Sequence, residues 1–240
     1  MKQFAGERLL FSQIDNRFAE EYKRYLLTAL SGAKKDGIIS HNTAGTYFSI
    51  FKAALKQAFI DGYLTVDVSA KMKGLKDQES RCEYLTVEEL NRLAATPCER
   101  DVLKRAALFS ALTGLRHCDI KKLQWKEISM VGKRAVLHFT QQKTKGVEYT
   151  PISDQALQLC GSAGLAEQFV FEDLPDPSWI SRPFKHWIES AGIGKKITFH
   201  CFRHTFATLQ LTSGTDIYTV SKMEMQQKTV RLDKRYAAIL

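Results

Sequence analysis

The sequence predicts a mainly α-helical protein with a small β-sheet or hairpin, in which a helical bundle precedes a mixed α/β domain. Three observations lead to this fold class. Apolar residues recur at steps of three and four in the first third of the chain. A polar segment follows the helical pattern near residue 80. In the second half of the chain, two short β-like runs flank a turn.

The first helix is indicated by one apolar face, which is formed by Phe18, Tyr22, Tyr25, Leu26, Ala29 and Leu30. Ser40 has the side chain of a helix cap, and Asp61-Gly62 is a stop signal. The apolar positions between them are Ala44, Tyr47, Phe48, Phe51, Leu55, Ala58 and Phe59. These two helices predict a small helical bundle with lysines along its rim.

Residues 74–83 are mostly polar and lack apolar periodicity, so we expect a linker there. We therefore expect two domains, residues 1–80 and residues 83–240. Thr86 and Glu89 match a capping box at the start of the second domain.

The remaining elements follow from local signals in the second domain. A helix over about 100–113 should end at Gly114. The runs 134–139 and 147–152 should form a hairpin around the basic turn TQQKTKG. Further helices are expected over residues 179–191, 200–213, 216–223 and 229–240.

Composition excludes several classes of protein. The 240 residues are 44% hydrophobic and 25% charged, which is typical of a globular chain. No apolar run approaches the roughly 18 residues of a membrane helix, so we expect no membrane contact. Five widely spaced cysteines without a Cys-x-x-Cys pair indicate neither a zinc site nor a disulfide framework. Reduced thiols fit a cytoplasmic protein best.

The net charge of +9 favours a polyanion as partner, most often nucleic acid. The alternative is a solvated surface that happens to be basic. Both residues 1–80 and residues 81–240 carry an excess of basic side chains, so both domains would share the contact.

Three segments carry residues suited to phosphate chemistry. Arg116 opens a helix just after Gly114, where its planar fork can face a phosphate or pair with Asp119. His200 and Arg203 share a helix face, and together they can hold a phosphate oxygen or move a proton. His204 lies on a neighbouring face and is expected to be buried.

The third segment holds Tyr236, near the end of the chain. A tyrosine at such a place is either a packing residue or a nucleophile.

A histidine followed by an arginine three residues later, as in His200 and Arg203, is a weak metal pattern, because arginine is not a usual ligand. We therefore expect no metal.

These segments, in this order, resemble the tyrosine recombinase or phage integrase family. TGLRHCDIKKLQW resembles its first box with Arg116, and HCFRHTFAT resembles its second box with His200 and Arg203. QQKTKGVEYTPI resembles the hairpin that carries the family's lysine. Lys143 is the better match and Lys145 the runner-up. QKTVRLDKRYAAI resembles the terminal box, with Tyr236 as the nucleophile.

The resemblance covers nearly the whole chain, with residues 1–80 similar to the core-binding domain and 83–240 similar to the catalytic domain. It begins at the core-binding domain, so no separate arm-binding domain is expected. One position departs from the family. Gln227 stands where the last box usually has histidine, and glutamine can donate a hydrogen bond but cannot hold a charge.

The resemblance implies a site-specific DNA recombinase or integrase. Such an enzyme cleaves and rejoins strands through a 3′-phosphotyrosine intermediate, without metal or nucleotide cofactor. The implied partner is double-stranded DNA, with a monomer in its absence and a tetramer on paired sites. An accessory DNA-bending protein is a candidate further partner. Two alternatives stay open. The first, which Gln227 suggests, is a DNA-binding protein of this fold with weakened catalysis. The second is a type IB topoisomerase-like enzyme that relaxes supercoiled DNA.

Overall fold

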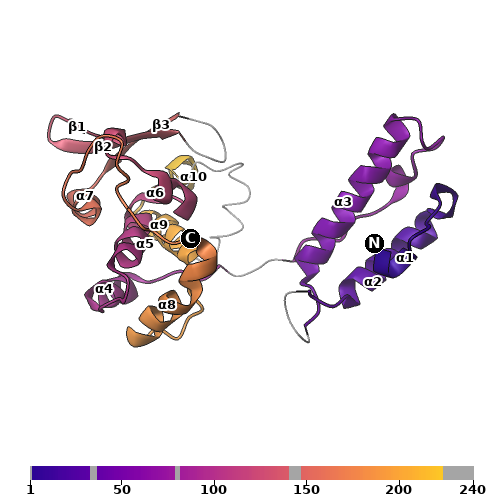
Figure 1. The fold of residues 1–240 in the computed structure, drawn as a ribbon, viewed down its shortest axis with the longest axis horizontal. Helices are drawn as coiled ribbons and strands as arrows, with labels where there is room; N and C mark the ends of the chain where they lie inside the picture. Colours follow the sequence, from indigo (N-terminus) through magenta and orange to yellow (C-terminus); the bar gives the residue numbers. More distant parts are fainter. Residues whose placement is uncertain (1, 33–36, 79–81, 141–146, 224–240) are drawn as a thin grey trace. The chain divides into compact units, whose positions relative to one another are not determined.

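The structure is a computed structural model that describes residues 2–32, 37–78, 82–140 and 147–223. The chain forms two compact units, Met1–Ser80 and Arg81–Leu240 (Figure 1). The predicted fold class is confirmed, since the described residues are mostly helical and include one small antiparallel sheet.

The regular secondary structure of the first unit, over its described residues, is helical apart from one isolated bridge. Its elements are α1 (Lys2–Ala5), a 3-10 turn (Phe11–Gln13), α2 (Asn16–Thr28), α3 (His41–Ile60) and a second 3-10 turn (Val68–Lys71). Helix α3 begins where the sequence predicts, because the Ser40 hydroxyl accepts a hydrogen bond from the Thr43 N–H at 3.2 Å. It ends at Asp61, also as predicted.

The core of the first unit lies between α2 and α3. Its central side chains are Tyr22, Leu26, Phe48 and Leu55, each buried. Three expectations about the two apolar faces are wrong. Helix α2 ends at Thr28, so Leu30 lies beyond it and is 77% exposed. On α3, Tyr47 is 48% exposed and Phe59 is 38% exposed. Periodicity alone does not decide which flank of an apolar face is covered.

The second unit contains a short sheet beside a group of helices. Its elements are α4 (Val87–Ala95), α5 (Asp101–Thr113), α6 (His117–Lys122), a 3-10 turn (Trp125–Glu127), β1 (Ile128–Val131), β2 (Arg134–Thr140), β3 (Val147–Ile152), α7 (Asp154–Cys160), α8 (Pro177–Ser190), α9 (Phe199–Thr212) and α10 (Ile217–Met223). The predicted helices of this unit are confirmed as far as residue 223. The capping box ahead of α4 is present, because the Glu89 N–H donates to the Thr86 hydroxyl and the Thr86 N–H donates to the Glu89 carboxylate.

The sheet is antiparallel in the order β1-β2-β3 and lies near α7 (Figure 1). The two predicted strands pair as expected, with Ala135 opposite Ile152. Strand β1 was not predicted, and it pairs with β2 through a tight turn at Gly132. Four residues are too few to show the alternation that marks a strand in the sequence. Ala135 and Leu137 of the central strand face the core.

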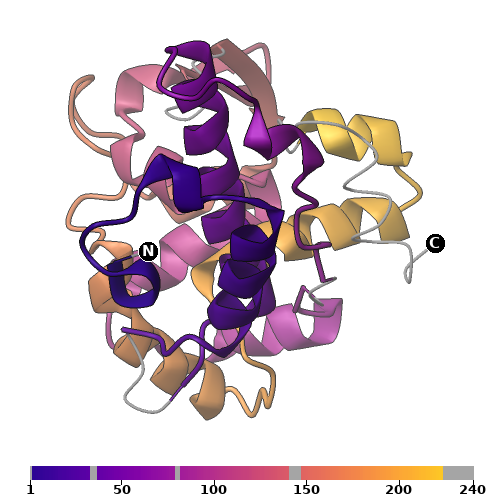
Figure 2. The ribbon, with the colours of Figure 1, turned by 90° about the vertical axis from the view of Figure 1, so that its right-hand side faces the viewer.

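Helix α9 is the centre of the second unit. Ten of its residues are buried, and it packs along α5. Phe202 stacks on Trp187 of α8 with ring centroids 6.2 Å apart. On another side α10 lies against α9 (Figure 2). Val220 of α10 is buried in a cluster with Ala207 and Leu211. Side chains that project from this helix are therefore held by packing on several sides.

The turn after α5 approaches α9 closely. Gly114 ends α5 in the left-handed conformation, with φ of 72°. A Cβ atom added at this residue would lie 2.7 Å from Cδ1 of Phe206, which is too close. Glycine is needed here both for its backbone conformation and for its missing side chain.

We predict that Gly114→Ala destabilises the protein more than Gly192→Ala does. Both glycines follow helices with φ near 70° (72° and 67°), so alanine costs about 1 kcal/mol of left-handed strain at either place. A Cβ at Gly192 has nothing within 4 Å, whereas at Gly114 overpacking should add about 1–3 kcal/mol. Urea unfolding followed by tryptophan fluorescence measures both, because Trp125, Trp179 and Trp187 all lie in the second unit. Equal losses would show that Phe206 yields without cost.

Candidate active site

Arg116 lies at the N-terminal end of α6, directly after the Gly114 turn. Its Nη1 lies 3.9 Å from Oδ2 of Asp119, so the ion pair that the sequence allowed is present. The pair is not a surface one, because the side chains of Arg116 and Asp119 are only 16% and 3% exposed. A carboxylate buried beside the guanidinium limits the directions in which Arg116 can point.

His200 and Arg203 both project from the first turns of α9. His200 is exposed, whereas Arg203 is only 2% exposed. The guanidinium of Arg203 donates a hydrogen bond from Nη1 to the carbonyl oxygen of Gly114. Because a buried arginine is costly without hydrogen-bond partners, this bond favours one arrangement of α9 against the Gly114 turn. The turn that leads to Arg116 is thereby joined to the helix that carries His200.

His204 was predicted to be buried, and this is confirmed, since it is 6% exposed. Its ring meets the ring of His200 edge-on, with centroids 4.6 Å apart and an angle of 80°. This contact restricts the rotation of the exposed His200 ring. His204 therefore positions its neighbour.

A second attachment to α9 was not visible in the sequence. The N–H of Leu85 donates to the hydroxyl of Thr205 at 2.9 Å, and that hydroxyl donates to the carbonyl of Cys201. Lys195 adds a bond to the carboxylate of Glu89 at 2.6 Å. The start of the second unit is thus bonded to the helix that carries His200 and Arg203. Residues 120 positions apart give no local signal of such a bond.

Burial raises the pKa of the Glu89 carboxyl, but the hydrogen bond from Lys195 and the bond from the Thr86 N–H outweigh it, so the net pKa is lowered. Glu89 therefore remains a carboxylate at neutral pH. It closes the cap of α4 and holds Lys195 at the same time.

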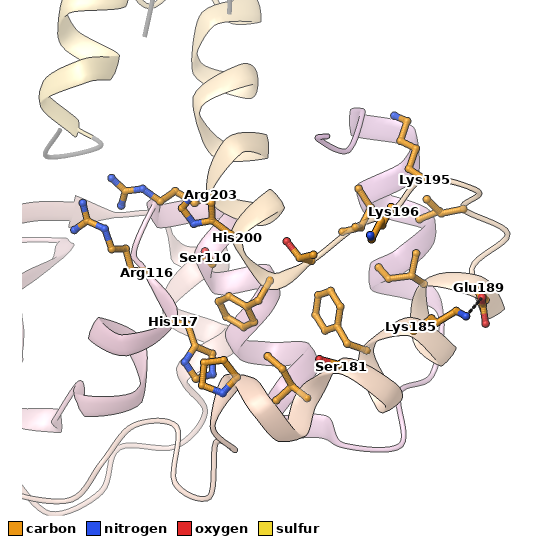
Figure 3. A pocket seen from close by; sticks show the side chains of 18 of the residues that line it. Ser110, Arg116, His117, Ser181, Lys185, Glu189, Lys195, Lys196, His200 and Arg203 are labelled. Atoms are coloured by element: carbon orange, nitrogen blue, oxygen red, sulfur yellow. Dashed lines mark ion pairs between the residues drawn. The ribbon is translucent and has the colours of Figure 1, made fainter. Parts of the chain in front are cut away.

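The three candidate residues line one cavity of about 810 Å³ in the second unit. In Figure 3, Arg116, His200 and Arg203 lie together at one side of this cavity, and Lys185, Lys195 and Lys196 lie toward the other. Residues 87 positions apart in the sequence are therefore brought into one site. Two guanidinium groups beside an imidazole can hold and neutralise a phosphate.

His117 also lines the cavity, although it was not among the candidates that the sequence indicated. Its ring meets Phe199 edge-on at 4.8 Å, and burial lowers its pKa, although a hydrogen bond to the backbone of Pro175 opposes this effect. Its Nε2 atom is buried and has no hydrogen-bond partner among the described residues. The adjacent Arg116 was the only signal in the sequence that could have drawn attention to it.

Four candidate residues lie outside the described residues: Lys143, Lys145, Gln227 and Tyr236. The helix expected over 229–240 lies outside them too. Strands β2 and β3, which flank the two lysines in the sequence, are paired up to Thr140 and Val147.

The described residues contain no group of three or more His, Cys, Asp or Glu side chains that could hold a metal ion. Within the same part of the chain, every helix is too short or too polar to cross a membrane.

The chain has a helical unit followed by a helical unit with a small antiparallel sheet. Recombinases of known structure have a similar fold. The fold is similar to that of a lambda integrase dimer bound to a COC′ core site, with a TM-score of 0.71 and 19% identity over 97% of this chain and 83% of that one. It is also similar to the XerH site-specific recombinase bound to a palindromic difH substrate, with a TM-score of 0.73 and 13% identity over 99% of this chain and 72% of that one.

The chain belongs to the phage integrase family. The family model for the phage integrase family matches residues 83–238, and that for the phage integrase SAM-like domain matches residues 1–73. The integrase of Salmonella phage P22 is 26% identical over 81% of this chain. A tyrosine recombinase of Thermosipho africanus is 22% identical over 88% of this chain and 77% of its own length. The matched region spans about half (53%) of the P22 integrase.

We predict that His117 makes stability fall as the pH is lowered from 7 to 5. Because its pKa is below 6.5 in the folded chain, the unfolded chain binds more protons in the window below 6.5, and unfolding becomes easier there. A difference of one pKa unit corresponds to about 1.4 kcal/mol. His117→Asn, which keeps a donor for the Pro175 carbonyl, should flatten this part of the pH profile of urea unfolding.

His186→Asn is the matched control, because it removes an exposed histidine from α8. An equal flattening by both variants would assign the pH dependence to histidines in general and not to the buried His117.

Proposed function

We propose that this protein is a site-specific tyrosine recombinase that cleaves and rejoins DNA strands. One observation carries the proposal: Arg116 from the α5–α6 turn lines the same cavity as His200 and Arg203 from α9, and the bond from Arg203 to Gly114 joins the two elements. The family membership supports it, as do relatives named integrase and tyrosine recombinase.

In the proposed reaction the Tyr236 oxygen attacks the scissile phosphorus in line, and the bond to the 5′ oxygen breaks. Lys143 gives a proton to the departing 5′ oxygen. Arg116 and Arg203 stabilise the charge that develops on the non-bridging oxygens. His200 takes up the proton that the Tyr236 hydroxyl loses, or it positions the phosphate. Gln227 adds a neutral hydrogen bond where the family usually has histidine.

The phosphotyrosine bond conserves the energy of the phosphodiester, so a second 5′ hydroxyl can reverse the step and rejoin the strand without a nucleotide cofactor. The arginines supply the positive charge that Mg²⁺ supplies in many phosphoryl transfers. Asp119 acts through Arg116, because it limits the direction of that guanidinium. Asp119 is a positioning residue in this scheme.

The two units have different proposed tasks. Residues 1–80 are the core-binding domain and residues 83–240 the catalytic domain, and both contact double-stranded DNA, mainly through phosphates. Such binding weakens steeply with salt. We further propose a monomer that assembles into a tetramer on paired sites in the cytoplasm, with an accessory DNA-bending protein as a candidate partner.

The first prediction of this scheme is that Tyr236→Phe abolishes covalent attachment to DNA and leaves DNA affinity nearly unchanged. The hydroxyl acts only in the chemical step, so its loss removes the adduct without removing phosphate contacts. Denaturing electrophoresis of the protein after incubation with fragmented DNA detects the adduct, and a gel-shift titration gives the affinity. The control is Tyr218→Phe, which changes an exposed tyrosine on α10.

An adduct that persists in Tyr236→Phe and disappears in Tyr218→Phe would move the nucleophile to Tyr218. A wild-type chain that binds DNA without forming an adduct, and forms one after Gln227→His, would favour the weakened DNA-binding protein. Relaxation of supercoiled DNA that lacks a specific site would favour the topoisomerase-like alternative.

The second prediction separates the two lysines of the hairpin turn. Lys143→Ala should slow cleavage by at least about 10²-fold, as expected for loss of a general acid, and Lys145→Ala should slow it much less. A substrate with a 5′-thio leaving group needs no proton, so it should restore the rate of the Lys143 variant. If the 5′-thio substrate restores the cleavage rate of the Lys145 variant and not that of the Lys143 variant, Lys145 is the general acid.

A further inference from the structure

The cavity beside Arg116 and His200 is larger than a phosphate group requires. Its volume of about 810 Å³ falls in the range of small-molecule sites, roughly 300–1,000 Å³. All of its lining residues belong to the second unit. Much of its wall is formed by apolar side chains, namely Leu115, Ile180, Phe184, Ile188, Ile197 and Phe199.

The charges that line the cavity are mainly positive. Two arginines and three lysines contribute to the lining, whereas Glu189 is the only acidic side chain among the lining residues that the structure describes. Lys185 is paired with Glu189 at 3.6 Å, and Lys195 is paired with Glu89 at 2.6 Å. Two of the three lysines at that side are thus paired with carboxylates. Figure 3 shows Arg116, His200 and Arg203 together at the other side, where Arg116 is paired with Asp119 at 3.9 Å.

His117 adds a polar group to the lining. The backbone of Pro175 accepts a hydrogen bond from this ring, and the buried Nε2 atom has no partner among the described residues. The bond to Pro175 therefore comes from the Nδ1–H, and in the neutral ring Nε2 keeps a lone pair that can accept a hydrogen bond.

We propose that this cavity binds a small amphipathic anion. Its apolar body lies along α8, and its carboxylate, phosphate or sulfonate group lies at Arg116 and His200. The size of the cavity selects a small molecule, the apolar wall selects a hydrocarbon body, and the positive lining selects a negative charge. The proposal uses the geometry of the second unit and does not require that the chain cleaves DNA.

The test is a fluorescence titration of the full chain with anilinonaphthalene sulfonate, an amphipathic anion with an N–H group, in the absence of DNA. We expect a saturable increase with one site per chain. Decanoate and decyl phosphate should displace the probe, whereas decyltrimethylammonium, with the same chain and the opposite charge, should not. Equal displacement by the cation would overturn the proposal, and so would the absence of saturable binding.

Two exposed serines on α8 provide a matched pair for the apolar body. Ser181 lines the cavity and Ser178 does not, although they lie one turn apart on the same helix. Ser181→Phe should weaken probe binding at least about tenfold by filling the space, and Ser178→Phe should leave it within about twofold. A cooperative urea transition by tryptophan fluorescence shows that both variants fold. Equal affinities in the two folded variants would place the probe elsewhere.

A second pair tests the charged end. Arg116→Gln should raise the decanoate concentration needed for displacement at least about tenfold, because one charge-assisted contact is lost. Arg182→Gln, which removes an exposed arginine of α8 outside the cavity lining, should not change it. If both variants respond equally, the anion senses the overall charge of the protein and not this site.

Discussion

The hydrogen bond from the Arg203 guanidinium to the carbonyl oxygen of Gly114 is the contact on which the candidate site depends. It joins two segments that are 89 positions apart, and it lies where a buried cation must find an acceptor. The same turn needs glycine, because Phe206 of α9 leaves no room for a Cβ and because φ is positive. Packing and hydrogen bonding therefore favour one placement of the turn, and Arg116 follows two residues later. The placement of Arg203 therefore constrains the placement of Arg116.

The surroundings of this contact stiffen it. Helix α9 is buried on several faces, and the Leu85 N–H and Lys195 attach the start of the second unit to α9 and to the loop before it. Asp119 supplies a buried negative charge next to Arg116. Charges in such a shielded environment interact more strongly than they would in water. A site that stabilises developing charge on a phosphate benefits from this preorganisation, because little reorientation is needed when the charge appears.

The cavity combines an apolar wall with a group of cations. Its wall is continuous with the hydrophobic core of the second unit, through side chains such as Phe184 and Phe199. One side of it carries the cations that we assign to phosphate binding. An apolar wall lowers the local dielectric constant, so the electrostatic attraction between the arginines and an anion in the cavity is stronger than in water. The two proposed ligands, a DNA phosphate and a small anion with a hydrocarbon body, would both use this combination of an apolar wall and cations.

The sequence by itself determined most of the helices, the two longer strands and the candidates Arg116, His200 and Arg203, because caps, stop signals and short motifs act within a few residues. Lys143, Gln227 and Tyr236 remain predictions of the sequence. Only the tertiary structure decided that Leu30 is exposed, that β1 completes the sheet, and that Arg203 is buried against Gly114. It alone also decided the role of Thr205 and the cavity beside His117. These features depend on contacts between residues far apart in the chain, and such contacts form only when the whole unit packs.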